Sequence, residues 1–267
     1  PVSITSQPSG LAVNPGAPAS FSVAATGTAP VSYQWRKNGV SIAGGTAATF
    51  AIAAAQTVDA GTYDVVVMNV VGPVTSTGAV LFLNSPVSIT TQPGTLAVNP
   101  GAPATFSVVA TGTAPLAYQW YRAGTAIPGA TLANYTIGAV QASDADSYSV
   151  SVSNVVGAVA SNAAQLSVNV PVSFPTQPVP LTVNPGVSAT FNVIPAGTAP
   201  FTYQWRKNGT PITGGTAQSL TIASAQAADA ANYDVVVTNV VGSATSAAAA
   251  LSVNTPVSIT AQPVGGA

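Results

Sequence analysis

The chain has 267 residues, of which 47% are hydrophobic and only 4% are charged. Its net charge of −1 offers no basic surface for nucleic acid or anionic lipid, and the absence of Cys, His and Glu removes disulfides, thiol nucleophiles and the usual zinc ligands. Turn residues interrupt every apolar run before the roughly 18 residues that a membrane-spanning helix requires. We therefore expect a β-rich protein without a membrane span, and no enzyme.

The first predicted element is a strand with the sequence PVSIT, which begins at residue 1 and recurs at 86, at 171 as PVSFP, and at 256. The tryptophans at 35, 120 and 205 have the same spacing of 85 residues. A constant period predicts a tandem array, with repeats at 1–85, 86–170 and 171–255. Both recent duplication and a need for constant geometry explain the equal lengths.

The later elements of repeat one are runs in which apolar residues alternate with period two, as in strands. The residues that share a face are Phe21 and Val23; Val31, Tyr33 and Trp35; Phe50 and Ile52; Tyr63, Val65 and Val67; and Ala79, Leu81 and Leu83. Turn residues separate these runs, so each repeat is predicted to be an antiparallel β-sandwich. Ala-rich segments near 53–60 and 223–231 allow one helical turn at most.

The last predicted element, 256–267, repeats the first strand without the rest of a repeat. A lone strand cannot bury its apolar face. We favour the explanation that the array continues; the alternative is that this segment pairs with a neighbouring molecule by strand addition.

Repeated residues form one pattern, which in repeat one comprises Gly16, Phe21, Val23, Gly27, Pro30, Tyr33, Trp35, Asp59, Gly61, Tyr63, Val65, Asn69 and Gly72. The pattern resembles the intermediate-set immunoglobulin domain, in particular the cysteine-free versions that occur in tandem in large secreted bacterial proteins. The resemblance covers all three repeats. It implies an all-β protein of three tandem immunoglobulin-like sandwiches in an extended rod.

The resemblance also implies roles for residues that recur in every repeat. Trp35, Trp120 and Trp205 are expected in the cores. Valines take the place of the family's inter-sheet disulfide, in the pairs Val23 with Val65, Val108 with Val150, and Val193 with Val235. Tyr63, Tyr148 and Tyr233 match the tyrosine corner, whose hydroxyl bonds back to the chain. Asp59, Asp144 and Asp229 are expected to stabilise the preceding turn by accepting backbone N–H groups.

No residue is assigned a catalytic, cofactor-binding or metal-binding role. Asp144 and Asp146 are a close carboxylate pair, but they occur in repeat two alone, and no segment is rich enough in oxygen ligands for calcium. Arg36 and Arg206 are expected to face Asp64 and Asp234 on a neighbouring strand. Asn134 and Asn208 fit the N-glycosylation pattern, but two matches are near the number expected by chance in a chain this rich in Asn and Thr. The aromatic rings of Tyr121 and Phe201 are candidates for carbohydrate contact, although neither recurs in all repeats.

Outward-facing valines mark the late strands, where an isolated domain would carry charge. The candidate assembly surface consists of Val66, Val70, Val71, Val155, Val156, Val240 and Val241. Because few charges oppose association, we expect contacts with copies of the same chain or with further repeats. The sequence favours an extracellular structural protein, part of a surface fibre, filament or stalk. An adhesin or carbohydrate-binding module that contacts surface glycans, and a passive spacer of a larger secreted protein, are the alternatives.

Overall fold

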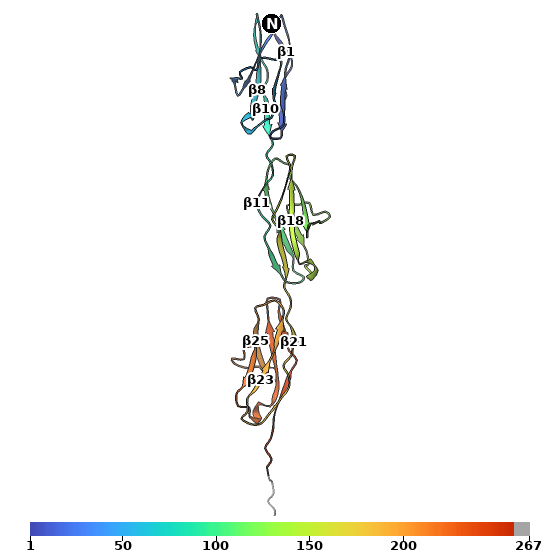
Figure 1. Ribbon diagram of the computed structural model, residues 1–267, viewed down its shortest axis with the longest axis vertical. Helices are drawn as coiled ribbons and strands as arrows, with labels where there is room; N and C mark the ends of the chain where they lie inside the picture. Colours follow the sequence, from blue (N-terminus) through green and yellow to red (C-terminus); the bar gives the residue numbers. More distant parts are fainter. Residues whose placement is uncertain (259–267) are drawn as a thin grey trace, which may run out of the picture. The chain divides into compact units, whose positions relative to one another are not determined.

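The structure is a computed structural model that describes residues 1–258, and its regular structure consists of β-strands and three short 3-10 turns. The same series of strands recurs three times along the chain (Figure 1). The expected all-β class with three tandem immunoglobulin-like domains is confirmed. Over the described range, no helix is long and apolar enough to cross a membrane.

The strands of the three repeats correspond closely in length and position. Repeat one contains β1 (Ser3–Ser6), β2 (Leu11–Val13), β3 (Ala19–Ser22), β4 (Ala24–Thr26), β5 (Ser32–Lys37), β6 (Val40–Ser41), β7 (Thr49–Ile52), η1 (Thr57–Asp59), β8 (Gly61–Asn69), β9 (Gly72–Thr75) and β10 (Ala79–Leu83). Repeat two contains β11 (Ser88–Thr91), β12 (Leu96–Val98), β13 (Ala104–Ser107), β14 (Val109–Thr111), β15 (Ala117–Arg122), β16 (Thr125–Ala126), β17 (Asn134–Ile137), η2 (Ala142–Asp144), β18 (Asp146–Ser153), β19 (Ala158–Ala160) and β20 (Ala164–Val168). Repeat three contains β21 (Ser173–Thr176), β22 (Leu181–Val183), β23 (Ala189–Asn192), β24 (Ile194–Ala196), β25 (Thr202–Lys207), β26 (Thr210–Pro211), β27 (Ser219–Ile222), η3 (Ala227–Asp229), β28 (Ala231–Thr238), β29 (Ser243–Thr245) and β30 (Ala249–Val253).

In each repeat a six-stranded main sheet faces two short strand pairs. In repeat one the main sheet has the order β2-β10-β8-β5-β6, with β9 also paired to β8, and the short pairs are β1-β4 and β3-β7. The pairings are antiparallel except that of β2 with β10, which is parallel and departs from the expected arrangement. The chain changes sheets between β1 and β2 at Pro8, which cannot donate a ladder hydrogen bond.

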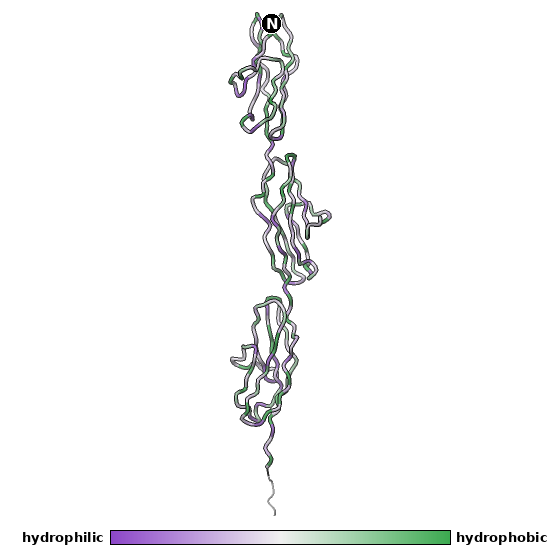
Figure 2. Tube along the Cα trace, in the orientation of Figure 1, coloured by the Kyte–Doolittle hydropathy of each residue, from purple (hydrophilic) through white to green (hydrophobic). Residues whose placement is uncertain are grey.

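The core of repeat one lies between the sheets. Phe21 on β3 stacks on Tyr63 of β8 with ring centroids 4.7 Å apart and lies 6.1 Å from the Trp35 ring. Alternate residues of β8 and β10 are buried, and Ala79 and Leu81 complete the core. Hydrophobic and hydrophilic residues are interspersed along the trace, as strand alternation requires (Figure 2).

By compactness, the chain divides into two units whose boundary passes through repeat two. One unit contains Pro1–Gly94, Thr105–Tyr135 and Ser147–Ala164, and the other contains Thr95–Ala104, Thr136–Asp146 and the residues from Gln165 onward. Most of the expected extra strand at 256–267 lies outside the described residues. Its first three residues have no regular structure, and the side chain of Val257 is 98% exposed.

Candidate functional site

The repeated tryptophans are fully buried in their repeats. Each indole N–H donates a hydrogen bond to a main-chain carbonyl 12 residues later; Trp35 donates to Ala47 O at 2.9 Å. The six valines at the disulfide positions are also buried: Val23, Val65, Val108, Val150, Val193 and Val235. These positions therefore supply packing, with the one polar atom of each indole satisfied.

The repeated tyrosine and aspartate build one turn at the start of the long central strand. Tyr63 Oη donates to Asp59 O at 2.7 Å, and Gln56 N donates to Asp59 Oδ2 at 2.8 Å. In repeat three, Tyr233 and Asp229 make the same hydroxyl contact at 2.9 Å. In repeat two, Gln141 N donates to the Asp144 carboxylate in the same way. The carboxylates thus close η1, η2 and η3 through capping boxes.

The tyrosine corners predict a loss of stability at high pH. Burial raises the pKa of the Tyr63 phenol above its ordinary value, and the Asp59 carboxylate adds to the shift; Tyr233 and Asp229 show the same effect. A raised folded-state pKa means that the stabilisation is fully present below the ordinary tyrosine pKa of about 10 and is lost as pH rises through the folded value.

We therefore expect the urea midpoint to be constant from about pH 7 to 9 and to fall above about pH 10. Tyr63→Phe also removes the hydrogen bond to Asp59 O, so it lowers stability at neutral pH as well. The informative quantity is the slope of the urea midpoint against pH above about pH 10. For repeat one, Tyr63→Phe should make this slope shallower. An unchanged slope would show that this phenol does not titrate with unfolding.

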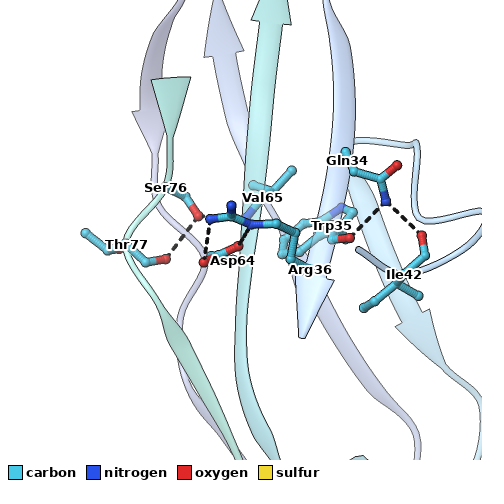
Figure 3. Close-up of polar contacts among 8 residues, drawn as sticks. All are labelled: Gln34, Trp35, Arg36, Ile42, Asp64, Val65, Ser76 and Thr77. Atoms are coloured by element: carbon cyan, nitrogen blue, oxygen red, sulfur yellow. Dashed lines mark hydrogen bonds and ion pairs between the residues drawn. The ribbon is translucent and has the colours of Figure 1, made fainter. Parts of the chain in front are cut away.

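Polar contacts surround Trp35 on both sides of β5. Arg36 forms a bidentate pair with Asp64 on β8, with Nε–Oδ1 at 2.7 Å and Nη2–Oδ2 at 3.0 Å, as expected (Figure 3). This hydrogen bond and the nearby carboxylate raise the pKa of the Arg36 guanidinium. Arg206 and Asp234 form the equivalent pair in repeat three. The pairs join strands within a repeat, and such partly exposed pairs contribute about 1 kcal/mol or less.

Two further polar side chains in the same region were missed by the sequence reasoning. Gln34 Nε2 donates to Trp35 O at 3.0 Å and to Ile42 O at 2.8 Å. The buried Ser76 Oγ accepts from Val65 N and donates to Thr77 O, both at 3.0 Å (Figure 3). The recurrence of Gln before every Trp was an available signal, because a glutamine this close to the core requires partners.

These side chains hold backbone segments in place. Across residues 1–258 no group of three or more His, Cys, Asp or Glu side chains could hold a metal ion. Lys37 Nζ bonds to Val58 O, and Lys207 Nζ donates to Ala228 O at 2.7 Å. Phe201, one of the candidate glycan contacts, packs against the core of repeat three instead of presenting a free ring.

The valines of the candidate assembly surface differ in how far they are exposed. Val70, Val71, Val155 and Val240 are exposed, and Val70 reaches 82%. Val66, Val156 and Val241 are partly buried. Val66 lies in the middle of the main sheet between Gln34 and Thr75, whose side chains flank it.

Three other apolar side chains of repeat one are exposed, and the sequence reasoning missed them. Met68 on β8 and Val80 and Phe82 on β10 are 48%, 54% and 53% exposed. All three point to the outer side of the main sheet, with Met68 near the end of β8 and Val80 opposite Thr62 near its start. We call this spaced set the apolar face of repeat one. The equivalent residues are Ser153, Gln165 and Ser167 in repeat two and Thr238, Ala250 and Ser252 in repeat three. The apolar face therefore belongs to repeat one.

The sequence matches known immunoglobulin families along all three repeats. The family model described as "Immunoglobulin domain" matches residues 1–69 and 86–154, and the "Immunoglobulin I-set domain" model matches residues 172–253. The chain belongs to the immunoglobulin domain family.

Among individual proteins, the muscle M-line assembly protein unc-89 of Caenorhabditis elegans is 34% identical over a 216-residue alignment, which covers 73% of this chain and 3% of that protein. A three-domain I-band fragment of titin superposes with a TM-score of 0.64 at 21% identity, covering 96% of this chain and 99% of the fragment. The three N-terminal domains of the outer capsid protein Hoc of bacteriophage RB49 give a TM-score of 0.55 at 18% identity, covering 95% and 99%. These matches support a tandem immunoglobulin array that resembles structural proteins, and they do not support a bacterial origin.

Proposed function

We propose that the chain is a structural array located outside the cell, in which immunoglobulin domains act as spacers of a surface fibre or stalk and associate weakly with a second copy. The observation that carries the proposal is the apolar face of repeat one, together with the scarcity of charge.

The energetics of the apolar face indicate a weak contact. Covering the exposed half of Met68, Val80 or Phe82 contributes about 1 kcal/mol for each side chain. Two such faces together contribute about 6 kcal/mol, whereas association costs about 4–15 kcal/mol in lost motional freedom. A contact between two chains is therefore reversible, and many aligned chains are needed to make it stable.

Sedimentation equilibrium tests this association directly. Set against the lowest association cost, the burial leaves a binding free energy of about −2 kcal/mol, which corresponds to a Kd of about 30 mM. We therefore expect the weight-average mass of the wild-type chain to rise by only about 5% as the concentration approaches about 1 mM. The double variant Met68→Ser/Phe82→Ser, which introduces the residues of repeat two, should remain monomeric. The control Ser153→Ala/Ser167→Ala should behave as wild type. A wild-type chain that stays monomeric throughout would exclude the association.

The location is tested separately with antibodies to the chain. Labelling of intact source cells supports the extracellular proposal. Labelling only after permeabilisation would overturn it and favour a second candidate, an intracellular scaffold, to which the 34% identity with unc-89 points.

A further inference from the structure

A pair of asparagines closes the C-terminal end of each repeat. Asn84 Nδ2 donates to Asn14 Oδ1 at 2.8 Å, and Asn84 N donates to Val13 O at 2.9 Å. The pairs Asn169 with Asn99 and Asn254 with Asn184 repeat the side-chain contact at 2.8 and 2.7 Å. In each pair the residue earlier in the chain accepts this bond through its Oδ1. The bond orients that residue's amide group, so that its own Nδ2 is available to a different partner.

In two repeats that second partner belongs to the following repeat. Asn14 Nδ2 donates to Val155 O at 2.9 Å, and Asn99 Nδ2 donates to Val240 O at 3.0 Å. Each contact lies within one compact unit, and in each the donor and acceptor are 141 residues apart. Asn184, the third member, is exposed, and its Nδ2 has no partner among residues 1–258.

The turn that accepts this bond is itself held to the chain that joins the repeats. Asn154 Oδ1 accepts from Val156 N at 3.0 Å, which fixes the turn between β18 and β19. Its Nδ2 donates to Ser85 O at 2.8 Å, and Ser85 N donates to Thr113 Oγ1 at 2.7 Å. In repeat three, Asn239, Val170 and Thr198 make the same contacts at 2.8 and 2.7 Å. The joining residue, the turn and the preceding repeat thus form one network.

We propose that the Asn14–Asn84 pair and its equivalent Asn99–Asn169 are an interaction surface for the next immunoglobulin domain, and that they restrict the motion of neighbouring repeats. The partner they fit is a domain that presents the main-chain carbonyl of an Asn-Val-Val-Gly turn. The donor is a neutral amide and the acceptor a neutral carbonyl, so the joint is insensitive to salt and pH. It does not depend on association between copies.

The chain has no cysteine, so spin labels attach only to cysteines that are introduced by substitution. Ser22→Cys and Ser107→Cys place one label at equivalent exposed positions of β3 and β13, in repeats one and two. Double electron–electron resonance on the full chain then gives the distribution of label distances. Removing one neutral hydrogen bond should lower the ratio of closed to open joints by about 2- to 12-fold, which broadens the distribution.

We expect broadening for Asn14→Ala, and a smaller broadening for Asn84→Ala, which leaves the donor present but no longer oriented. Two matched controls should keep the wild-type width: Asn184→Ala, whose Nδ2 has no partner among residues 1–258, and Asn99→Ala, which affects the other joint. Circular dichroism melting verifies that each variant is folded. Wild-type widths for both Asn14→Ala and Asn84→Ala, or equal broadening by Asn184→Ala, would overturn the proposal.

Discussion

Replacing Trp35 by alanine is expected to destabilise repeat one by about 3–5 kcal/mol. The indole is fully buried, and its ring centroid lies 6.1 Å from that of Phe21 and 6.2 Å from that of Phe50. The substitution leaves a cavity between the sheets and removes the donor to Ala47 O. The repeat has no disulfide to limit its unfolded state, so its stability depends on packing and hydrogen bonds of the kind that this substitution removes.

Differential scanning calorimetry of the full chain measures this effect. Repeats two and three retain their own tryptophans, so the variant should show one transition moved to lower temperature beside transitions close to those of the wild type. Trp35→Phe, which fills part of the cavity, should give a smaller shift. A thermogram identical to the wild type would show that the indole does not support the fold.

Replacing Gly197 by alanine should be the second most damaging single change, with a loss of about 2–5 kcal/mol in repeat three. Gly197 has φ +134°, and a Cβ placed there would lie 2.6 Å from Pro171 O. Pro171 O is a backbone atom, so the chain that enters the repeat has to move. This displacement also affects Thr198, which accepts a hydrogen bond from Val170 N at 2.7 Å.

The matched control is Gly186→Ala in the same repeat. Gly186 has φ +83° but no atom within 4 Å of the added Cβ, so only left-handed strain of about 1–2 kcal/mol is expected. Urea unfolding of both variants separates the close approach from the strain. Equal losses in the two variants would show that the contact with Pro171 O is relieved without cost.

Much of the fold follows from local pattern. Strand alternation places Tyr63, Val65 and Val67 on one face of β8, and the period of 85 residues repeats that assignment. The tyrosine corner was also predictable, because Tyr63 bonds to a carbonyl four residues earlier. The location of the chain and its association with copies are expectations of a different kind, because they concern partners and surroundings.

Alternation alone determined which face of a strand each side chain occupies, but not how far that face is covered. Val66 and Met68 both point outward from β8, and both have strand partners on two sides, yet Val66 is partly buried whereas Met68 is exposed. Alternation also did not predict the parallel pairing of β2 with β10, which arises because the chain passes from one sheet to the other between β1 and β2.

By itself, the sequence determined the strands, the buried residues and the period, because these depend on contacts whose pattern is local. Only the tertiary structure decided which asparagines join neighbouring repeats. Asn14 and Asn84 are 70 residues apart, and Asn14 and Val155 are 141 residues apart. Most of the asparagines lie outside the strands. A pairing among them depends on the folded backbone, because each hydrogen bond requires donor and acceptor to meet within about 3 Å.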